Sequence, residues 1–255
     1  MSALTERSAR VVAAAKLLRL AGRRRAGRFL AEGPNLVEAA VRAGVVVELF
    51  ATEAAAERHA DLLTGQHVHA ITERAAKALS DTVTPTGLVA VCETPEPALS
   101  TVLTGARLVA VAVGMSEPGN AGTLIRLAHA MGAAGVVLAG HSVDPYNGKC
   151  LRSSTGSIFA VPVVVEPDTE AVLAALKGAG LQVLATTLDG ETELGDADLT
   201  GPTAWLFGPE AHGLPAEVAA AADHRVRIEM PGDAESLNVA AAAAICLYQS
   251  ARAGR

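Results

Sequence analysis

The first residues that could do chemistry follow an apolar run. LVAVAVG occupies 108–114, and EPGNAGTLIRLAHAMG at 117–132 comes almost directly after it. Pro118-Gly119 predicts a turn, and Asn120 and Arg126 follow near the start of a predicted helix. Ligands of open α/β sheets bind where strands end, and arginine offers a fixed fork of donors for phosphate. The segment is therefore either an anion-binding turn or a tight turn beside a surface arginine.

A second segment, LFGPEAHGL at 206–214, runs from a predicted buried strand into a loop bracketed by glycines. Glu210 lies between Gly208 and Gly213, a position that packing explains poorly. Its carboxylate could hold a ligand rich in donors, or it could cap a helix. His212 could take part in catalysis, although a loop histidine that faces solvent is the more ordinary interpretation.

The third segment is IEMPGDAESLNVAAAAAICLYQ at 228–249. Its Met-Pro-Gly sequence predicts a turn, and Ser236 can serve as the N-cap of a helix. Asn238 would then project from the first turn, where free N–H groups favour polar ligands. The alanine run that follows suits close helix packing, within a domain or across a dimer. An ordinary capped helix is the alternative.

Signatures of other catalysts are missing from the sequence. The pair His67 and His69 has no further ligands at metal-binding spacing. Cys92, Cys150 and Cys246 lie far apart, and we expect Cys92 and Cys246 to be buried small hydrophobic residues. The sequence contains no G-x-S-x-G, P-loop or G-x-G-x-x-G motif. It thus predicts no metal site and no Rossmann-type dinucleotide site.

Composition limits the class of protein. The 255 residues are 50% hydrophobic but only 3% aromatic, so alanine, valine and leucine must fill the core. A broad aromatic platform for stacking bases is therefore disfavoured. We find no apolar run of membrane-spanning length and no signal-peptide apolar region in MSALTERSAR. With an odd number of cysteines, the sequence predicts a soluble protein of the reducing cytoplasm.

Charge is distributed unevenly along the chain. The formal net charge is −6, yet residues 1–30 contain eight basic residues and a single acidic one. A basic N-terminal segment, the basic head (residues 1–30), followed by an acidic remainder of the chain indicates a local phosphate-binding face. A solvated helix surface is the alternative interpretation.

The elements that must position these residues alternate between strands and helices. In the first part, a helix at 5–20 is interrupted by GRRRAGR at 22–28, and an α/β pattern follows. In the second part, apolar strands at 108–114, 135–140, 182–188 and 203–208 alternate with helices, which predicts a doubly wound parallel sheet. The expected domains are residues 1–95 and 105–255, joined by a proline-containing linker at 96–104.

Together and in this order, the three segments resemble the motifs of the SpoU/TrmH family of RNA ribose 2′-O-methyltransferases, in the SPOUT superfamily. The segment 144–163, which contains Arg152, also resembles the family. The first half is similar to the N-terminal substrate-binding domain of many members, a ribosomal-protein-like RNA-binding fold. Departures are mild: Glu117 stands where Asp is usual, and Ala211-His212 stand where a glycine is often found.

The resemblance implies an α/β fold in which a C-terminal parallel sheet carries a deep trefoil knot, a rare exception to unknotted topology. A small N-terminal α/β domain would bind the substrate. The resemblance also implies a homodimer with an active site completed across its interface, and S-adenosyl-L-methionine held largely by backbone groups in the knot. The implied cofactor-binding positions are Leu206, Gly208, Ile228, Met230 and Leu237.

Methyl transfer from a sulfonium to a 2′-hydroxyl is an in-line displacement, which requires alignment of three atoms and loss of the hydroxyl proton. In the family, the residue that matches Arg126 is the leading candidate for this activation. Because a guanidinium does not give up its proton in proteins, we prefer for Arg126 the role of phosphate anchor and electrostatic stabiliser over that of the base. The implied catalytic residues are Arg126, Asn120, Glu210, Ser236 and Asn238.

The resemblance makes ribosomal RNA the expected substrate, with large-subunit RNA favoured, because tRNA-specific relatives often lack the N-terminal domain. A tRNA 2′-O-methyltransferase and an rRNA methyltransferase that confers antibiotic resistance are alternatives. A non-catalytic RNA-binding or ribosome-assembly factor would be expected to have lost some catalytic residues, and a small-molecule enzyme would not need the basic head. The residues expected to contact RNA are Arg23, Arg24, Arg25, Arg28 and Arg152.

Overall fold

The computed structural model describes residues 3–254, which form two units. Unit 1 contains the chain up to Pro95 together with Tyr146–Phe159, and unit 2 contains Glu96–Pro145 and the chain from Ala160 onward. The outer ends of the two expected domains, residues 1–2 and 255, lie outside the described residues. Segment 96–104, expected to be a linker, contains helix α7, Leu99–Leu103.

Unit 1 is built on a four-stranded sheet in the order β1-β4-β2-β3. Strand β4 is antiparallel to β1 and β2, whereas β2 and β3 are parallel. The strands are β1 (Arg28–Glu32), β2 (Val46–Ala51), β3 (Val68–Ala70) and β4 (Leu88–Glu93). The helices are α1 (Ala9–Ala15), α2 (Leu20–Ala26), α3 (Pro34–Ala43), α4 (Glu53–Arg58), α5 (Ala60–Leu63), α6 (Glu73–Ala78) and α9 (Gly148–Ser154).

The arginine-rich segment 22–28 is largely helical, so the predicted position of the helix break is wrong: the break lies at Arg19, which has an extended backbone. Gly22 lies inside α2, where an added Cβ atom would come within 1.9 Å of the carbonyl oxygen of Lys16. The missing side chain thus lets α2 turn back closely on the preceding 3-10 turn Lys16–Leu18. Gly27 ends α2 with a left-handed φ of 59°. Helix α2 therefore carries Arg24 and Arg25 on an exposed surface.

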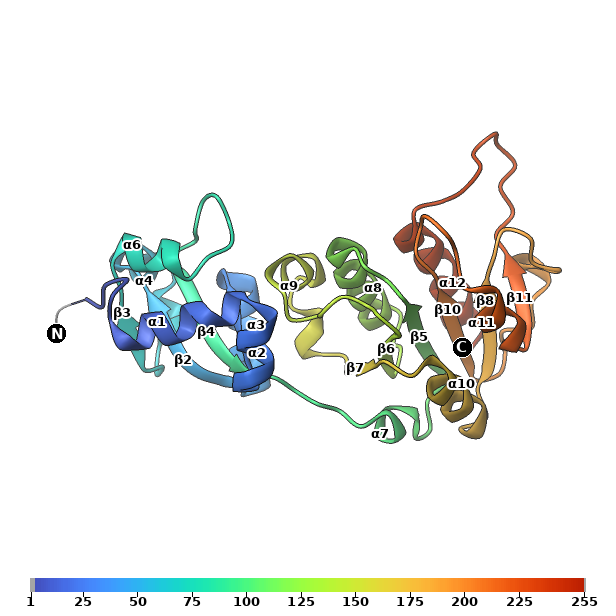
Figure 1. Cartoon of the computed structure of the whole chain (residues 1–255), viewed down its shortest axis with the longest axis horizontal. Coiled ribbons are helices and arrows are strands. Elements are labelled where there is room, and N and C mark those ends of the chain that lie inside the picture. Colours follow the sequence, from blue (N-terminus) through green and yellow to red (C-terminus); the bar gives the residue numbers. More distant parts are fainter. Residues whose placement is uncertain (1–2, 255) are drawn as a thin grey trace. The chain divides into compact units, whose positions relative to one another are not determined.

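Unit 2 contains a parallel seven-stranded sheet in the order β7-β6-β5-β10-β8-β11-β9 (Figure 1). Its strands are β5 (Leu108–Val113), β6 (Gly135–Ala139), β7 (Val163–Glu166), β8 (Gln182–Thr186), β9 (Thr192–Glu193), β10 (Thr203–Phe207) and β11 (His224–Arg227). The strands predicted at 108–114, 135–140, 182–188 and 203–208 correspond to β5, β6, β8 and β10. Because all strands point the same way, the loops that follow β5, β10, β8 and β11 emerge at one edge.

Helices cover both faces of this sheet. Helices α8 (Pro118–Ala130) and α12 (Val239–Ala253) pack against each other and against β5, while α7, α10 (Thr169–Gly178) and α11 (Ala216–Ala221) contribute to an apolar cluster with alternate residues of β5 and β10. The fully buried Trp205 of β10 donates a hydrogen bond of 2.8 Å from its indole to Ser250 of α12. This bond holds the last helix against the centre of the sheet.

The cysteines Cys92 and Cys246 are buried, as expected from the sequence. Burial raises the pKa of both thiols to about 12, so they stay protonated. Within residues 3–254, no helix has the length and apolar character needed to cross a membrane.

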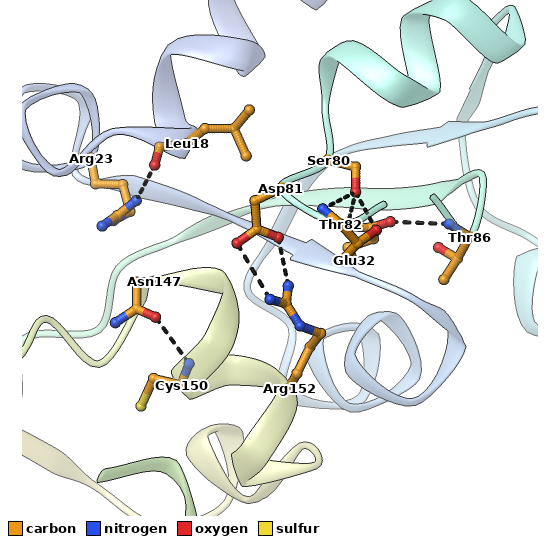
Figure 2. Close-up of polar contacts among 10 residues, drawn as sticks. All are labelled: Leu18, Arg23, Glu32, Ser80, Asp81, Thr82, Thr86, Asn147, Cys150 and Arg152. Carbon is orange, nitrogen blue, oxygen red and sulfur yellow. Dashed lines mark hydrogen bonds and ion pairs between the residues drawn. The ribbon is translucent and has the colours of Figure 1, made fainter. Parts of the chain in front are cut away.

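Arg23 is buried, in contrast to the two arginines that follow it. Only 8% of Arg23 is exposed, and its guanidinium donates hydrogen bonds of 2.9 Å and 3.0 Å to the carbonyl oxygens of Leu17 and Leu18 (Figure 2). These carbonyls end the 3-10 turn before α2, so Arg23 fixes the angle between the two segments. Arg23 thus has a structural role, and Arg24 and Arg25 are the arginines that α2 exposes for the predicted RNA contact.

We expect Arg23→Ala to lower the free energy of unfolding by about 1–3 kcal/mol, because two carbonyl groups lose their charged donor. The matched control is Arg24→Ala, which removes an exposed arginine from the same helix and is expected to change stability by less than about 0.5 kcal/mol. Urea unfolding followed by circular dichroism measures both. Equal destabilisation by the two substitutions would contradict the structural role of Arg23.

Candidate active site

A cavity of about 620 Å³ lies in unit 2 at the carboxyl edge of the sheet. The loops after β8, β10 and β11 and the start of α12 form its wall. Its size falls within the range of small-molecule sites. Of the residues expected to bind the cofactor, Gly208, Ile228, Met230 and Leu237 line this cavity.

Leu206 is placed differently from that expectation. Its side chain is fully buried in the apolar cluster beneath the edge and does not line the cavity. Its carbonyl oxygen accepts a hydrogen bond of 2.8 Å from the hydroxyl of Thr186 at the end of β8. Leu206 thus supports the cavity wall by joining β10 to β8, and its predicted role in cofactor binding would fall to its backbone groups and not to its side chain.

Gly208 makes the tight loop after β10 possible. An added Cβ atom would lie 2.4 Å from backbone atoms of Gly213 and Leu214, so the loop closes on itself at this point. A Cβ so close to main-chain atoms would force the loop open. The closed loop presents Glu210 toward α8 and α12, as its hydrogen bonds show.

One carboxylate oxygen of Glu210 connects the three motifs. Oε1 accepts hydrogen bonds from Asn120 Nδ2 at 3.1 Å, from the backbone N–H of Val239 at 3.2 Å, and from Asn238 Nδ2. Asn238 Nδ2 also lies 3.4 Å from Asn120 Oδ1. Residues from the loop after β10, from the first turn of α8 and from the start of α12 therefore share one polar network.

Asn238 has a second task, because it is the N-cap of α12. Its Oδ1 accepts hydrogen bonds from the backbone N–H groups of Ala240 at 2.9 Å and Ala241 at 3.4 Å. The prediction that Ser236 caps this helix is wrong, since α12 begins only at Val239. Ser236 instead lies on the preceding loop and lines the cavity.

Arg126 is not brought to the cavity within one chain. It lies on α8 six residues after Asn120, which is about 9 Å further along the helix. Its side chain is exposed, and among residues 3–254 it has no hydrogen bond or ion pair. The guanidinium is therefore available to a ligand or to a second chain.

Two features of the cavity escaped sequence reasoning. Thr187, directly after β8, lines the cavity, and its hydroxyl oxygen is buried without a hydrogen-bond partner in the described part of the chain. Arg225 of β11 also lines the cavity and forms ion pairs with Asp189 at 3.3 Å and Glu191 at 2.9 Å. The end of the predicted strand at 182–188 is the signal that could have pointed to Thr187.

Ion pairs hold the outer rim of the cavity. The backbone N–H of Arg225 donates to the carboxylate of Glu191 and lowers the pKa of that group. Glu229 lies between the cavity residues Ile228 and Met230, and its pKa is raised because it shares a hydrogen bond with the carboxylate of Glu193. These contacts connect the loop after β11 to strand β9.

The residues expected to contact RNA lie in unit 1. Arg24 and Arg25 are exposed on α2, and Arg28 is half-buried at the start of β1. Arg152 of α9 is paired with the carboxylate of Asp81 at 2.6 Å. No group of three or more metal-ligating side chains with the geometry to hold an ion occurs among residues 3–254.

Comparison with known proteins agrees with this geometry. A family model of the SpoU rRNA Methylase family matches residues 107–248, which is more than half of the chain. The chain belongs to the SpoU rRNA Methylase family. A second family model, of the MRM3-like substrate binding domain, matches residues 9–90. Both the expected family and the expected α/β fold, with a parallel sheet and an N-terminal α/β domain, are confirmed.

Individual relatives of this SpoU family chain are similar in sequence and in structure. The 23S rRNA (uridine(2479)-2'-O)-methyltransferase of Streptomyces viridochromogenes is 41% identical over 142 residues, 54% of this chain and 50% of that protein. The 23S rRNA (guanosine(2553)-2'-O)-methyltransferase RlmP of Bacillus subtilis is 38% identical over 52% of this chain and 54% of that protein. The chain thus spans about half the length of these curated relatives.

A solved structure of the SpoU family covers nearly the whole chain. The SpoU methyltransferase AviRb from Streptomyces viridochromogenes, crystallised in complex with AdoMet, has a TM-score of 0.86 and 33% identity to this chain. The match covers 96% of this chain and 98% of that chain. The likeness therefore includes both units and not the catalytic-family segment alone.

The Glu210 network predicts a local change that hydrogen exchange can measure. In Glu210→Ala the backbone N–H of Val239 loses its acceptor, and we expect its exchange to become about fivefold faster or more. In Glu210→Gln a side-chain oxygen can still accept, so protection should be largely kept. Amide exchange by NMR at Val239 distinguishes the two variants. Equal protection in both would show that Glu210 does not hold the start of α12.

Proposed function

We propose that this protein transfers a methyl group from S-adenosyl-L-methionine to a ribose 2′-hydroxyl of RNA, with large-subunit ribosomal RNA as the favoured substrate. The observation that carries the proposal is the network around Glu210, which joins all three family motifs beside a cavity of suitable size. The names of the relatives, which are 23S rRNA 2′-O-methyltransferases, support ribosomal RNA over tRNA. The match of residues 9–90 to a substrate binding domain supports it further.

The cavity residues fit S-adenosyl-L-methionine. Ile228, Met230 and Leu237 give an apolar wall suited to a purine ring, and the Thr187 hydroxyl, which has no partner among residues 3–254, could bond to a polar group of the ligand. The loops at the strand ends expose backbone groups beside Gly208. When bound, the cofactor would supply an electrophilic methyl group on a sulfonium. The chain's own task is to hold that methyl in line with the ribose oxygen.

We assign roles to the catalytic set from these positions. Glu210 holds Asn120 and Asn238 in fixed orientations, so the two amides can orient the ribose. Ser236 lines the cavity and can donate to the cofactor or the ribose. Arg126 would bind the phosphate next to the target and stabilise negative charge that develops on the 2′-oxygen.

The position of Arg126 supports a homodimer as part of the proposal. One chain leaves this guanidinium exposed on α8, and α8 packs beside α12, which exposes Ile245 and Tyr248. A second copy that packs on these helices would cover the two apolar side chains and could bring Arg126 to an active site. We further propose the trefoil knot in unit 2 and a cytoplasmic location, which suits an enzyme that acts on RNA.

The first test is methyl transfer itself. We expect radiolabel from S-adenosyl-L-methionine to enter unmodified ribosomal RNA and to survive alkali as a protected dinucleotide, which marks ribose 2′-O-methylation. Label in tRNA alone would identify the protein as a tRNA 2′-O-methyltransferase instead. Cofactor binding without label in either RNA would favour a non-catalytic RNA-binding factor.

Arg126→Ala is expected to lower methyl transfer by at least about a hundredfold, because removing one charged group that stabilises a transition state typically costs that much. Binding of S-adenosyl-L-methionine, measured by calorimetry, should change by less than about threefold, since Arg126 does not line the cavity. Arg126→Lys keeps the positive charge but loses the two-pronged guanidinium geometry, so its rate of methyl transfer should lie between those of the wild type and Arg126→Ala. Full activity of Arg126→Ala would remove this residue from the mechanism.

Replacing Arg24 and Arg25 together by alanine should weaken RNA binding and lower the slope of log K against log salt by about 1.4–1.8, if each contacts one phosphate. Arg58→Ala is the control, because it removes an exposed arginine outside the cluster. Filter binding over a series of salt concentrations measures the slope. An unchanged slope would assign Arg24 and Arg25 to solubility.

A further inference from the structure

An ion pair in unit 1 places a carboxylate where a phosphate was expected. Arg152 Nη1 lies 2.6 Å from Asp81 Oδ1, and Nη2 lies 3.4 Å from Oδ2, so two nitrogens of the guanidinium face the carboxylate (Figure 2). Asp81 lies in the loop between α6 and β4, 71 residues before Arg152. Arginine binds carboxylate and phosphate with the same two-pronged geometry.

Glu32 holds the loop that carries Asp81. Its Oε2 accepts a hydrogen bond of 2.6 Å from the Ser80 hydroxyl, and its Oε1 accepts one of 3.0 Å from the backbone N–H of Thr86 (Figure 2). Both ends of the short loop are therefore anchored to the end of β1. This anchoring fixes the backbone of the loop, so that the Asp81 side chain faces Arg152.

Gly148 leaves space in front of the guanidinium. A Cβ atom at this position would lie 2.4 Å from Asp81 Oδ2 and 2.8 Å from Arg152 Nη1. Any side chain at 148 would thus intrude on the place where an acceptor oxygen meets Arg152. The backbone keeps this place open for an oxygen-bearing group.

The pair is accessible to solvent and can exchange partners. The side chains of Arg152 and Asp81 are 40% and 41% exposed, so water and salt weaken their attraction. Arg23 in the same unit differs, because it is buried and bonded to backbone carbonyls. An RNA phosphate could therefore replace the carboxylate at Arg152, whereas no comparable exchange is open to Arg23.

We propose that Arg152 forms a phosphate-binding site for the RNA backbone, and that Asp81 occupies this site while RNA is absent. Binding of RNA here exchanges the Asp81 carboxylate for a phosphodiester. Asp81 thus competes with RNA phosphate for Arg152 and lowers the affinity for RNA that uses this site. This inference rests on the proposed function.

The test is RNA binding by Asp81→Asn, measured by filter binding with 23S ribosomal RNA transcribed in vitro. Releasing Arg152 should lower Kd by about two- to fivefold, the range for an exposed ion pair. Asp81→Ala should do the same. The control Asp61→Asn removes an exposed carboxylate elsewhere in unit 1 and should have a smaller effect. Arg152→Ala should weaken binding and lower the salt slope by about 0.7–0.9.

A double variant distinguishes exchange of partners at Arg152 from a general gain in RNA affinity caused by removing a negative charge. In the Arg152→Ala background, Asp81→Asn should tighten binding no more than Asp61→Asn does. Tightening of the same size with and without Arg152 would overturn the proposal. Loss of thermal stability in both Asp81 variants without tighter binding would make the pair a structural tie, and would also overturn it.

The same experiment separates this inference from the proposed function. A wild-type protein that binds and methylates RNA, with unchanged Kd in both Asp81 variants, would overturn the exchange at Arg152 alone. A wild-type protein that neither binds nor methylates RNA would overturn both.

Discussion

The candidate site depends on one carboxylate oxygen that accepts three hydrogen bonds. Glu210 Oε1 receives donors from Asn120, Asn238 and the backbone of Val239, which belong to the start of α8 and the start of α12. These segments are more than a hundred residues apart in the chain. Without this common acceptor, Asn120 would lose its bond to Glu210, and Asn238 would keep only its Oδ1 contacts with the first turn of α12 and the long contact with Asn120. A carboxylate suits this task, because hydrogen bonds to an ionised acceptor are stronger than neutral ones.

Parallel topology is what makes such a meeting possible. Strand β10 lies between β5 and β8, so the loop that contains Glu210 emerges between the turn before α8 and the cavity wall after β8. The buried Trp205 and its bond to Ser250 hold α12 against the same strand. Backbone pairing and core packing thus bring the loops together, and the polar network then fixes their side chains. The sheet thus determines where the candidate catalytic residues lie, and Glu210 fixes the orientation of the Asn120 and Asn238 side chains.

Sequence reasoning found what depends on local pattern. Apolar runs revealed β5, β6, β8 and β10, and the three motifs identified the side chains that meet at Glu210. The short strand β11, with sequence HRVR, carries charge where a buried strand would be apolar, and its arginines are held by ion pairs to the loop and strand before it. Such a short charged strand, which lies between β8 and the edge strand β9, has no hydrophobic signature. The same holds for Thr187, because only the folded structure shows that its hydroxyl is buried without a hydrogen-bond partner in the described part of the chain.

The arginines show most clearly why the remainder could not be read from sequence. Arg23, Arg24 and Arg25 are consecutive and chemically identical, yet a helical rotation of about 100° per residue turns one inward and leaves two outside. The inward side chain, that of Arg23, bonds to the carbonyl oxygens of Leu17 and Leu18 in the turn that packs closely on α2. Likewise, the family resemblance predicts that Arg152 contacts phosphate, but its partner in the structure is an aspartate 71 residues away. A charge pattern indicates the ligand class, whereas burial determines which charges can reach it. Since Arg152 and Asp81 keep about two fifths of their side chains in water, their pairing is compatible with exchange, and the buried contacts of Arg23 are not.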